Sequence, residues 1–129
     1  MYCLDTNIII AIFRGDRELA KKIGSINPDE ISFTAISLCE LFKGAYKSKQ
    51  REQSLKLIYD FASNYELVGL TQNSCEIFGK DFNALDKAGK QTEQFDLLTA
   101  SIAKENNLIL ITRNKKHFTN IPDLQLEEW

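Results

Sequence analysis

The chain has 129 residues, of which 43% are hydrophobic and 26% are charged. This is the length of one domain, so we expect a single domain over residues 1–129, and the composition excludes a disordered chain, a collagen-like repeat and a coiled-coil rod. Sixteen basic and eighteen acidic residues give a net charge of -2. That balance excludes a histone-like polycation, so binding to nucleic acid would need local basic patches or bound metal ions.

The few cysteines and histidines limit the possible chemistry. Three cysteines lie far apart without a C-x-x-C pair, which favours a reducing compartment such as the cytoplasm over a disulfide scaffold or a zinc site. The single histidine, His117, makes a Ser-His-Asp triad hard to build. No basic segment precedes the apolar run Ile8–Phe13, and no apolar run approaches about 20 residues, so we expect neither a signal peptide nor a membrane segment.

Short apolar runs alternate with stretches of helical periodicity. In chain order, the pattern predicts a strand at Tyr2–Leu4, helices at Ile8–Arg14 and Arg17–Ile26, a strand at Ile31–Phe33, helices from Thr34 through Tyr46 and from Leu55 through Ala62, a strand at Leu67–Gly69, helices from Cys75 through Leu85 and from Asp96 to Glu105, and strands at Leu108–Ile111 and Leu124–Leu126. This alternation predicts an α/β fold, with a mostly parallel sheet covered by helices on both faces.

Ligands of such sheets bind beyond the carboxyl ends of the strands. Asp5 directly follows the first predicted strand. Burying a carboxylate is costly unless a metal ion, a basic partner or hydrogen bonds compensate it, so Asp5 is a candidate site residue. From the residues alone, capping of the next helix is the favoured interpretation of Asp5, because aspartate is a favoured N-cap.

Glu40 lies in the otherwise nearly apolar run Ala35–Phe42, beside the predicted buried stripe. Gly44 lies one turn later on the same side, where a larger side chain would partly cover Glu40. Glu40 is therefore a second candidate. The alternative is an exposed glutamate that pairs with Lys43.

Other candidates flank the last predicted helix and the strand after it. Asp96 is expected to begin a helix rich in small residues, which would pack closely on the sheet and bring Asp96 near the strand ends. Glu93 could reach the same space, and Asn114 offers a neutral oxygen after the Leu108–Ile111 strand. Each has a structural alternative: Asp96 could be a helix cap, Glu93 a solvated loop acid and Asn114 a turn residue.

Converging carboxylates would give this chain a chemistry that needs no histidine base. Carboxylate oxygens are the ligands that Mg²⁺ prefers in proteins. Ions held in this way neutralise phosphate charge, lower the pKa of a bound water and stabilise a leaving oxygen. The chain therefore has the parts for metal-dependent hydrolysis of a phosphodiester.

Four motifs resemble, in order and spacing, those of PIN-domain ribonucleases, in particular the VapC-type toxins of bacterial and archaeal toxin–antitoxin pairs. They are Asp5-Thr6-Asn7, Glu40-Leu41-Phe42-Lys43-Gly44, Phe95-Asp96-Leu97-Leu98, and Leu110-Ile111-Thr112-Arg113-Asn114 with His117-Phe118. The resemblance spans essentially the whole chain, and it implies a three-layer α/β/α sandwich on a parallel sheet.

The resemblance also implies roles for these residues. The implied metal ligands are Asp5, Glu40 and Asp96; Asn114 completes the catalytic set; and the supporting residues are Thr6, Asn7, Glu93 and Thr112. Asn114 stands where the family often has aspartate, so one charge is missing, and Glu93 would partly compensate. The implied reaction is cleavage of transfer, ribosomal or messenger RNA by water activated by Mg²⁺ or Mn²⁺. The implied partners are a small VapB-like antitoxin, whose tail enters the active-site groove, and a second copy in a homodimer.

Two basic runs could contact RNA phosphates, which position RNA but carry little sequence information. The first run is Lys43, Lys47, Lys49 and Arg51, and the second is Arg113, Lys115, Lys116 and His117. The second run follows a strand and has the better claim, whereas a solvated helix end would explain the first. His117 is expected to be a surface or RNA-contacting residue.

Two other functions are open. Haloacid-dehalogenase-like phosphatases also place a nucleophilic aspartate after the first strand, but they need a second aspartate where this chain has Asn7. Trapping of phosphate on Asp5 would identify that class. A non-catalytic RNA- or protein-binding module on the same fold would bind RNA without a response to Mg²⁺ and would create no new RNA ends.

Overall fold

The computed structural model describes residues 1–129 and contains one five-stranded parallel sheet with the strand order β3-β2-β1-β4-β5. The strands are β1 (Tyr2–Leu4), β2 (Ile31–Thr34), β3 (Glu66–Val68), β4 (Ile109–Thr112) and β5 (Leu126–Glu128). The helices are α1 (Thr6–Phe13), α2 (Arg17–Gly24), α3 (Ala35–Lys47), α4 (Arg51–Asn64), α5 (Gln72–Lys87), α6 (Gln94–Glu105) and α7 (Lys115–Phe118). None of these helices has the length and apolar character that a bilayer-spanning segment needs.

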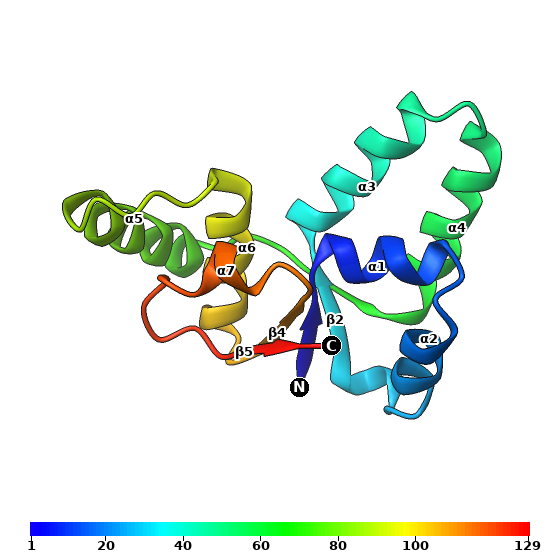
Figure 1. Cartoon of the computed structure of the whole chain (residues 1–129), viewed down its shortest axis with the longest axis horizontal. Coiled ribbons are helices and arrows are strands. Elements are labelled where there is room, and N and C mark those ends of the chain that lie inside the picture. Colours follow the sequence, from blue (N-terminus) through cyan, green and yellow to red (C-terminus); the bar gives the residue numbers. More distant parts are fainter.

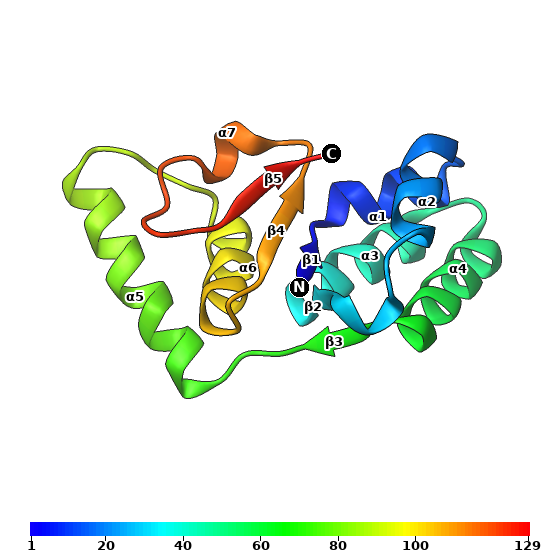
Figure 2. The same cartoon turned by 90° about the horizontal axis from the view of Figure 1, so that it is seen from below.

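Helices cover both faces of the sheet, which confirms the expected three-layer α/β/α sandwich (Figures 1 and 2). Because side chains alternate along a strand, Leu4 and Ile111 lie in one core and Cys3 and Leu110 in the other. The first core packs against α1, α2, α3 and α4, and the second against α5, α6 and α7.

The strand order reverses between β1 and β4. From β1 the chain continues to β2 and β3 on one side of the sheet, and it returns to β4 on the other side. Leu4 pairs with Ile111 in the register of β1 and β4, and the backbone N–H of Asp5 donates to the carbonyl of Ile111 at 2.9 Å. Ligands of open parallel sheets bind at such a reversal, so the fold directs attention to the residues after these strands.

The predicted elements are present, and the differences lie at their ends. Thr34 caps α3 as predicted, since its hydroxyl accepts from the backbone N–H of Ser37 at 3.1 Å. The prediction that Asp96 begins a helix is wrong by two residues: Glu93 is the N-cap and Asp96 lies in the first turn, where a negative charge also favours the helix. The last strand begins at Leu126, because its pairing with β4 starts only after the turn at Asp123, whose φ is 56°.

Candidate active site

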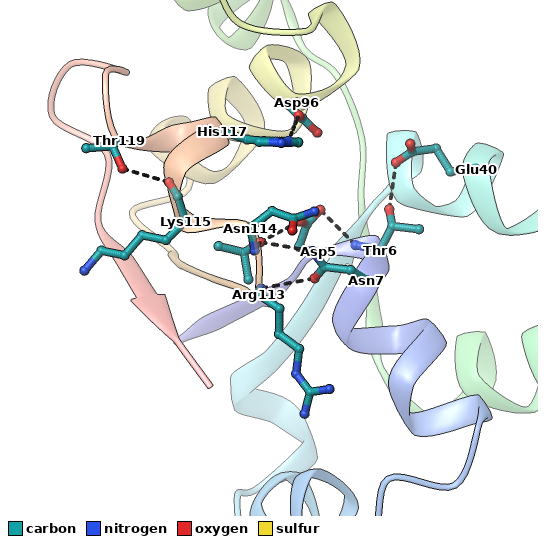
Figure 3. A network of polar contacts seen from close by, with 11 residues as sticks. Asp5, Thr6, Asn7, Glu40, Asp96, Arg113, Asn114, Lys115, His117 and Thr119 are labelled. Carbon is teal, nitrogen blue, oxygen red and sulfur yellow. Dashed lines mark hydrogen bonds and ion pairs between the residues drawn. The ribbon is translucent and has the colours of Figure 1, made fainter.

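Asp5 lies at the carboxyl end of β1 and is only 6% exposed (Figure 3). Its Oδ1 accepts from the backbone N–H of Thr6 at 2.8 Å, and its Oδ2 accepts from the hydroxyl of Thr112 at 2.8 Å. Burial raises the pKa of Asp5 above its usual range, although both hydrogen bonds lower it. Asp5 therefore caps α1, as the alternative interpretation predicted, and also forms a desolvated acidic group at the sheet edge.

Glu40 reaches the same edge from the middle of α3. Its Oε1 accepts from the hydroxyl of Thr6 at 2.7 Å. Burial raises the pKa of Glu40, and the negative charges of Asp5 and Glu93 raise it further. No salt bridge joins Glu40 to Lys43, so the interpretation of Glu40 as half of an exposed ion pair is not supported.

The space beside Glu40 is open, as the glycine at position 44 predicted. A Cβ at Gly44 would meet no atom within 4 Å. The opening belongs to a groove of about 420 Å³ between α1, α3 and α4, whose charged lining residues are Glu40 and Arg14. Apolar side chains line half of this groove, so it suits a partly apolar ligand.

Asp96 comes from the opposite layer, in the first turn of α6. Its Oδ2 lies 3.3 Å from Nδ1 of His117 on α7 (Figure 3). Burial, together with the charges of Asp5 and Glu93, raises the pKa of Asp96 to about 6. His117 is 51% exposed and is thus at the surface as expected, but its contact with Asp96 was missed. No local signal could reveal it, because the contact depends on how α7 packs beside α6.

The residues after β4 form a small polar network with Asn7. The hydroxyl of Thr112 accepts from Nδ2 of Asn7 at 3.4 Å and from the backbone N–H of Asn114 at 3.0 Å, while Oδ1 of Asn7 accepts from the backbone N–H of Arg113 at 3.3 Å. Asn114 occupies the N-cap position of α7, but its side chain makes no capping hydrogen bond. Its amide is therefore free for a ligand.

Glu93 faces the acidic cluster from the start of α6. Its side chain makes no capping hydrogen bond, and its charge acts on both Glu40 and Asp96. The negative charges of Asp5 and Glu93 thus act on both Glu40 and Asp96.

The basic residues near the site differ in whether an acidic residue already pairs with them. Arg113 is held by Asp16, since its Nη2 lies 2.6 Å from Oδ2 of Asp16, and its Nε donates to the carbonyl of Trp129 at 3.3 Å. The hydrogen bond from Arg113 lowers the pKa of Asp16. Lys115 and Lys116 are exposed at α7 and enter no salt bridge. The sequence did not predict the ion pair of Asp16 with Arg113, because Asp16 lies 97 residues from Arg113 in the chain.

The sequence model of the PIN domain family matches residues 2–124. The chain belongs to the PIN domain family. This PIN domain is 34% identical over 131 residues to Ribonuclease VapC1 of Haemophilus influenzae, covering 100% of this chain and 98% of that protein. It is 27% identical to the tRNA(fMet)-specific endonuclease VapC of Shigella flexneri, covering 99% of this chain and 97% of that protein. Within the family, it is a member of the VapC ribonucleases.

A solved structure of a similar PIN domain supports the same family assignment. The structure of VapBC2 from Rickettsia felis bound to a promoter DNA fragment has a TM-score of 0.92 and 33% identity, and the match covers 99% of this chain and 98% of that one. VapC membership favours the ribonuclease over the phosphatase that Asp5 alone left open.

The acidic side chains of this PIN domain do not form a closed metal cage, since no three acidic, histidine or cysteine groups are placed to hold one ion. Their chemistry nevertheless fits a hard divalent cation. The donors are carboxylate oxygens without a lysine or arginine partner, and Mg²⁺ binds through few carboxylates while it keeps several waters. Such a cation would offset both the burial and the repulsion that raise the pKa values of Glu40 and Asp96.

The raised pKa of Asp96 predicts how stability depends on pH without divalent ions. The folded protein binds more protons than the unfolded chain between the ordinary value of 3.8 and about 6, so the free energy of unfolding falls as pH rises through that interval. Solvent at this half-buried site limits the loss from Asp96 to about 1–2 kcal/mol. Urea unfolding in EDTA from pH 4 to 7 measures it. An Asp96→Asn variant with the same pH dependence as the wild type would contradict this assignment.

Proposed function

We propose that this PIN domain, residues 1–129, is a metal-dependent endoribonuclease that acts as the toxin of a toxin–antitoxin pair. The observation that carries the proposal is the convergence of Asp5, Glu40 and Asp96 at the reversal of strand order. These acids come from three separate elements. Capping of α1 explains Asp5 alone, because burial of Glu40 and Asp96 near its negative charge costs stability.

The acids provide the site for the cation. Asp5, Glu40 and Asp96 would hold Mg²⁺ or Mn²⁺, and Asn114 and Glu93 would act through its water shell. When bound, the ion supplies neutralisation of the phosphate charge and a water of lowered pKa for attack on phosphorus.

Neighbouring side chains orient these acids. Thr112 and Thr6 each direct a hydroxyl proton at one carboxylate oxygen, of Asp5 and Glu40 respectively, which leaves the other lone pairs for a ligand. The ring of His117 fixes one oxygen of Asp96. Asn7 holds Thr112 and the chain at Arg113 in place, so the supporting residues fix the acids before the substrate arrives.

RNA is the proposed substrate, bound through basic residues around the acids. Lys115 and Lys116 are the free cations on the β4 side, and Lys43 is exposed on α3 close to Glu40. Arg113 would contact a phosphate after exchanging its bond with Asp16. A similar relative is named for tRNA(fMet), so transfer RNA is the first class to test, ahead of ribosomal and messenger RNA, and the cytoplasm is the proposed place of action.

A VapB-like antitoxin is the proposed protein partner. A similar solved structure contains such a pair. The groove beside Glu40 has a lining that is half apolar and carries the acid Glu40, which would suit an amphipathic segment with a basic group directed at Glu40. We also propose a homodimer, which the molar mass in solution would test.

Cleavage of pooled cellular RNA tests the enzyme directly. Purified, antitoxin-free protein should give discrete fragments with Mg²⁺ or Mn²⁺ and none with EDTA. An Asp5→Asn variant purified in parallel should give none, which exposes contaminating nuclease. Equal cleavage by both proteins, or RNA binding without new ends, would refute the proposal and favour a non-catalytic RNA-binding module.

A further inference from the structure

A second hollow, of about 300 Å³, lies between the end of α5, the loop 88–93 and the first turn of α6. Its apolar part consists of Phe82, Leu85 and Leu97, and its polar part consists of Asp86, Lys90, Gln91, Thr92, Glu93 and Gln94. Glu93 is the only residue of this lining that the proposed reaction uses.

The hollow adjoins the acidic cluster. Glu93 lines it and also acts electrostatically on Glu40 and Asp96. Gln94 and Leu97, which line it as well, flank Asp96 along the first turn of α6. A group bound here would therefore be a near neighbour of the phosphate held by the acids.

The residues that line the hollow suit one flat aromatic ring with polar groups at its edge. Phe82 leaves 43% of its surface exposed, while Leu85 and Leu97 beneath are buried. Asp86 and Lys90 carry opposite charges but form no salt bridge, so both can bond a ligand. The volume lies at the small end of ligand pockets, too small for a helix of a partner. Unpaired RNA bases are recognised by stacking on aromatic rings and by hydrogen bonds to their edges.

We propose that this hollow binds one unpaired base of the RNA, next to the bond that is cut, and that it prefers guanine. Guanine presents two adjacent donors, N1–H and the N2 amino group, that a single carboxylate such as Asp86 can accept together. Its O6 and N7 are acceptors for the ammonium of Lys90. This inference rests on the proposed ribonuclease function.

The test uses RNA oligonucleotides that span the bond found to be cut in pooled RNA. The nucleotide on each side of that bond is varied in turn through all four bases. Guanine should be favoured at one position. Phe82→Ala and Phe82→Leu should lower kcat/KM for the guanine substrate by about 5- to 150-fold, the range that loss of base stacking produces. Asp86→Asn should remove the preference for guanine while the other substrates are cut as before. Asn83→Ala, next to Phe82 but outside the hollow, is the control.

The outcomes separate this inference from the proposed function. Cleavage with the same base preference in the wild type and in all Phe82 and Asp86 variants would overturn the base site and leave the ribonuclease standing. Variants that weaken antitoxin binding but not base preference would also overturn it, in favour of a protein contact. Cleavage of bis(p-nitrophenyl) phosphate, which carries no base, should be equal in all the variants. A loss there would mean that the substitutions disturb the acids and would overturn the inference.

Discussion

The Asp96→Asn variant is expected to lose RNA cleavage by at least about 10³-fold and to unfold less readily than the wild type when divalent ions are absent. The two effects have one cause. Burial and the charges of Asp5 and Glu93 raise the pKa of Asp96 to about 6, so on balance its negative charge is unfavourable in the metal-free fold, and a bound cation would offset that cost. Removing the charge should stabilise the protein by about 1 kcal/mol at pH 7. Fragment analysis and urea unfolding in EDTA measure the two effects.

An exposed aspartate serves as the control for this substitution. Asp60 lies on the outer side of α4, and Asp60→Asn should change neither quantity. A destabilised Asp96→Asn protein would contradict the idea that repulsion and burial govern this carboxylate. Retention of full activity would remove Asp96 from the proposed metal ligands.

The Lys104→Met variant is expected to lower the free energy of unfolding by about 3 kcal/mol. Nζ of Lys104 on α6 lies 2.7 Å from Oδ2 of Asp81 on α5, and the two side chains are only 15% and 8% exposed. Without Lys104, the carboxylate of Asp81 would stay buried without a partner, which is the costly part of breaking such a pair. Urea unfolding at pH 7 measures the loss.

Two further variants test whether burial explains the stability that Lys104→Met is expected to lose. Lys80 and Glu76 also pair on α5, but their side chains are 73% and 63% exposed, so Lys80→Met should cost less than about 0.5 kcal/mol. Replacing both partners, with Lys104→Met and Asp81→Leu together, should recover much of the lost stability. Equal losses from the two single lysine substitutions would contradict the explanation.

The α/β fold could be predicted from the sequence, because its strands and helices depend on local patterns. Apolar runs such as Tyr2–Leu4 mark strands wherever they pair, and an aspartate directly after a buried strand lies at a strand end in any parallel sheet. Gly44 revealed the opening beside Glu40 through helix geometry alone.

Long-range packing determined what the sequence did not reveal. The strand order, the contact of His117 with Asp96 and the bond between Arg113 and Asp16 all join segments that no periodicity relates. The hollow beside Phe82 needs α5 to lie against α6, and the sequence gives no measure of that approach. Helix starts were less well predicted than the helices themselves: α4 begins at Arg51 and α5 at Gln72, before the first apolar residue of each predicted pattern, because the first turn of each helix is polar.

The acids are divided between the two layers. Glu40 is carried by the layer packed on one face of the sheet, and Asp96 by the layer packed on the other, and α3 and α6 meet directly at the strand ends. The distance between these two carboxylates therefore depends on how the two helical layers pack against the sheet. A small molecule or mutation that displaces α6 relative to α3 would switch the site off without touching a carboxylate or competing with RNA. Inhibitors of this chain thus need not resemble its substrate.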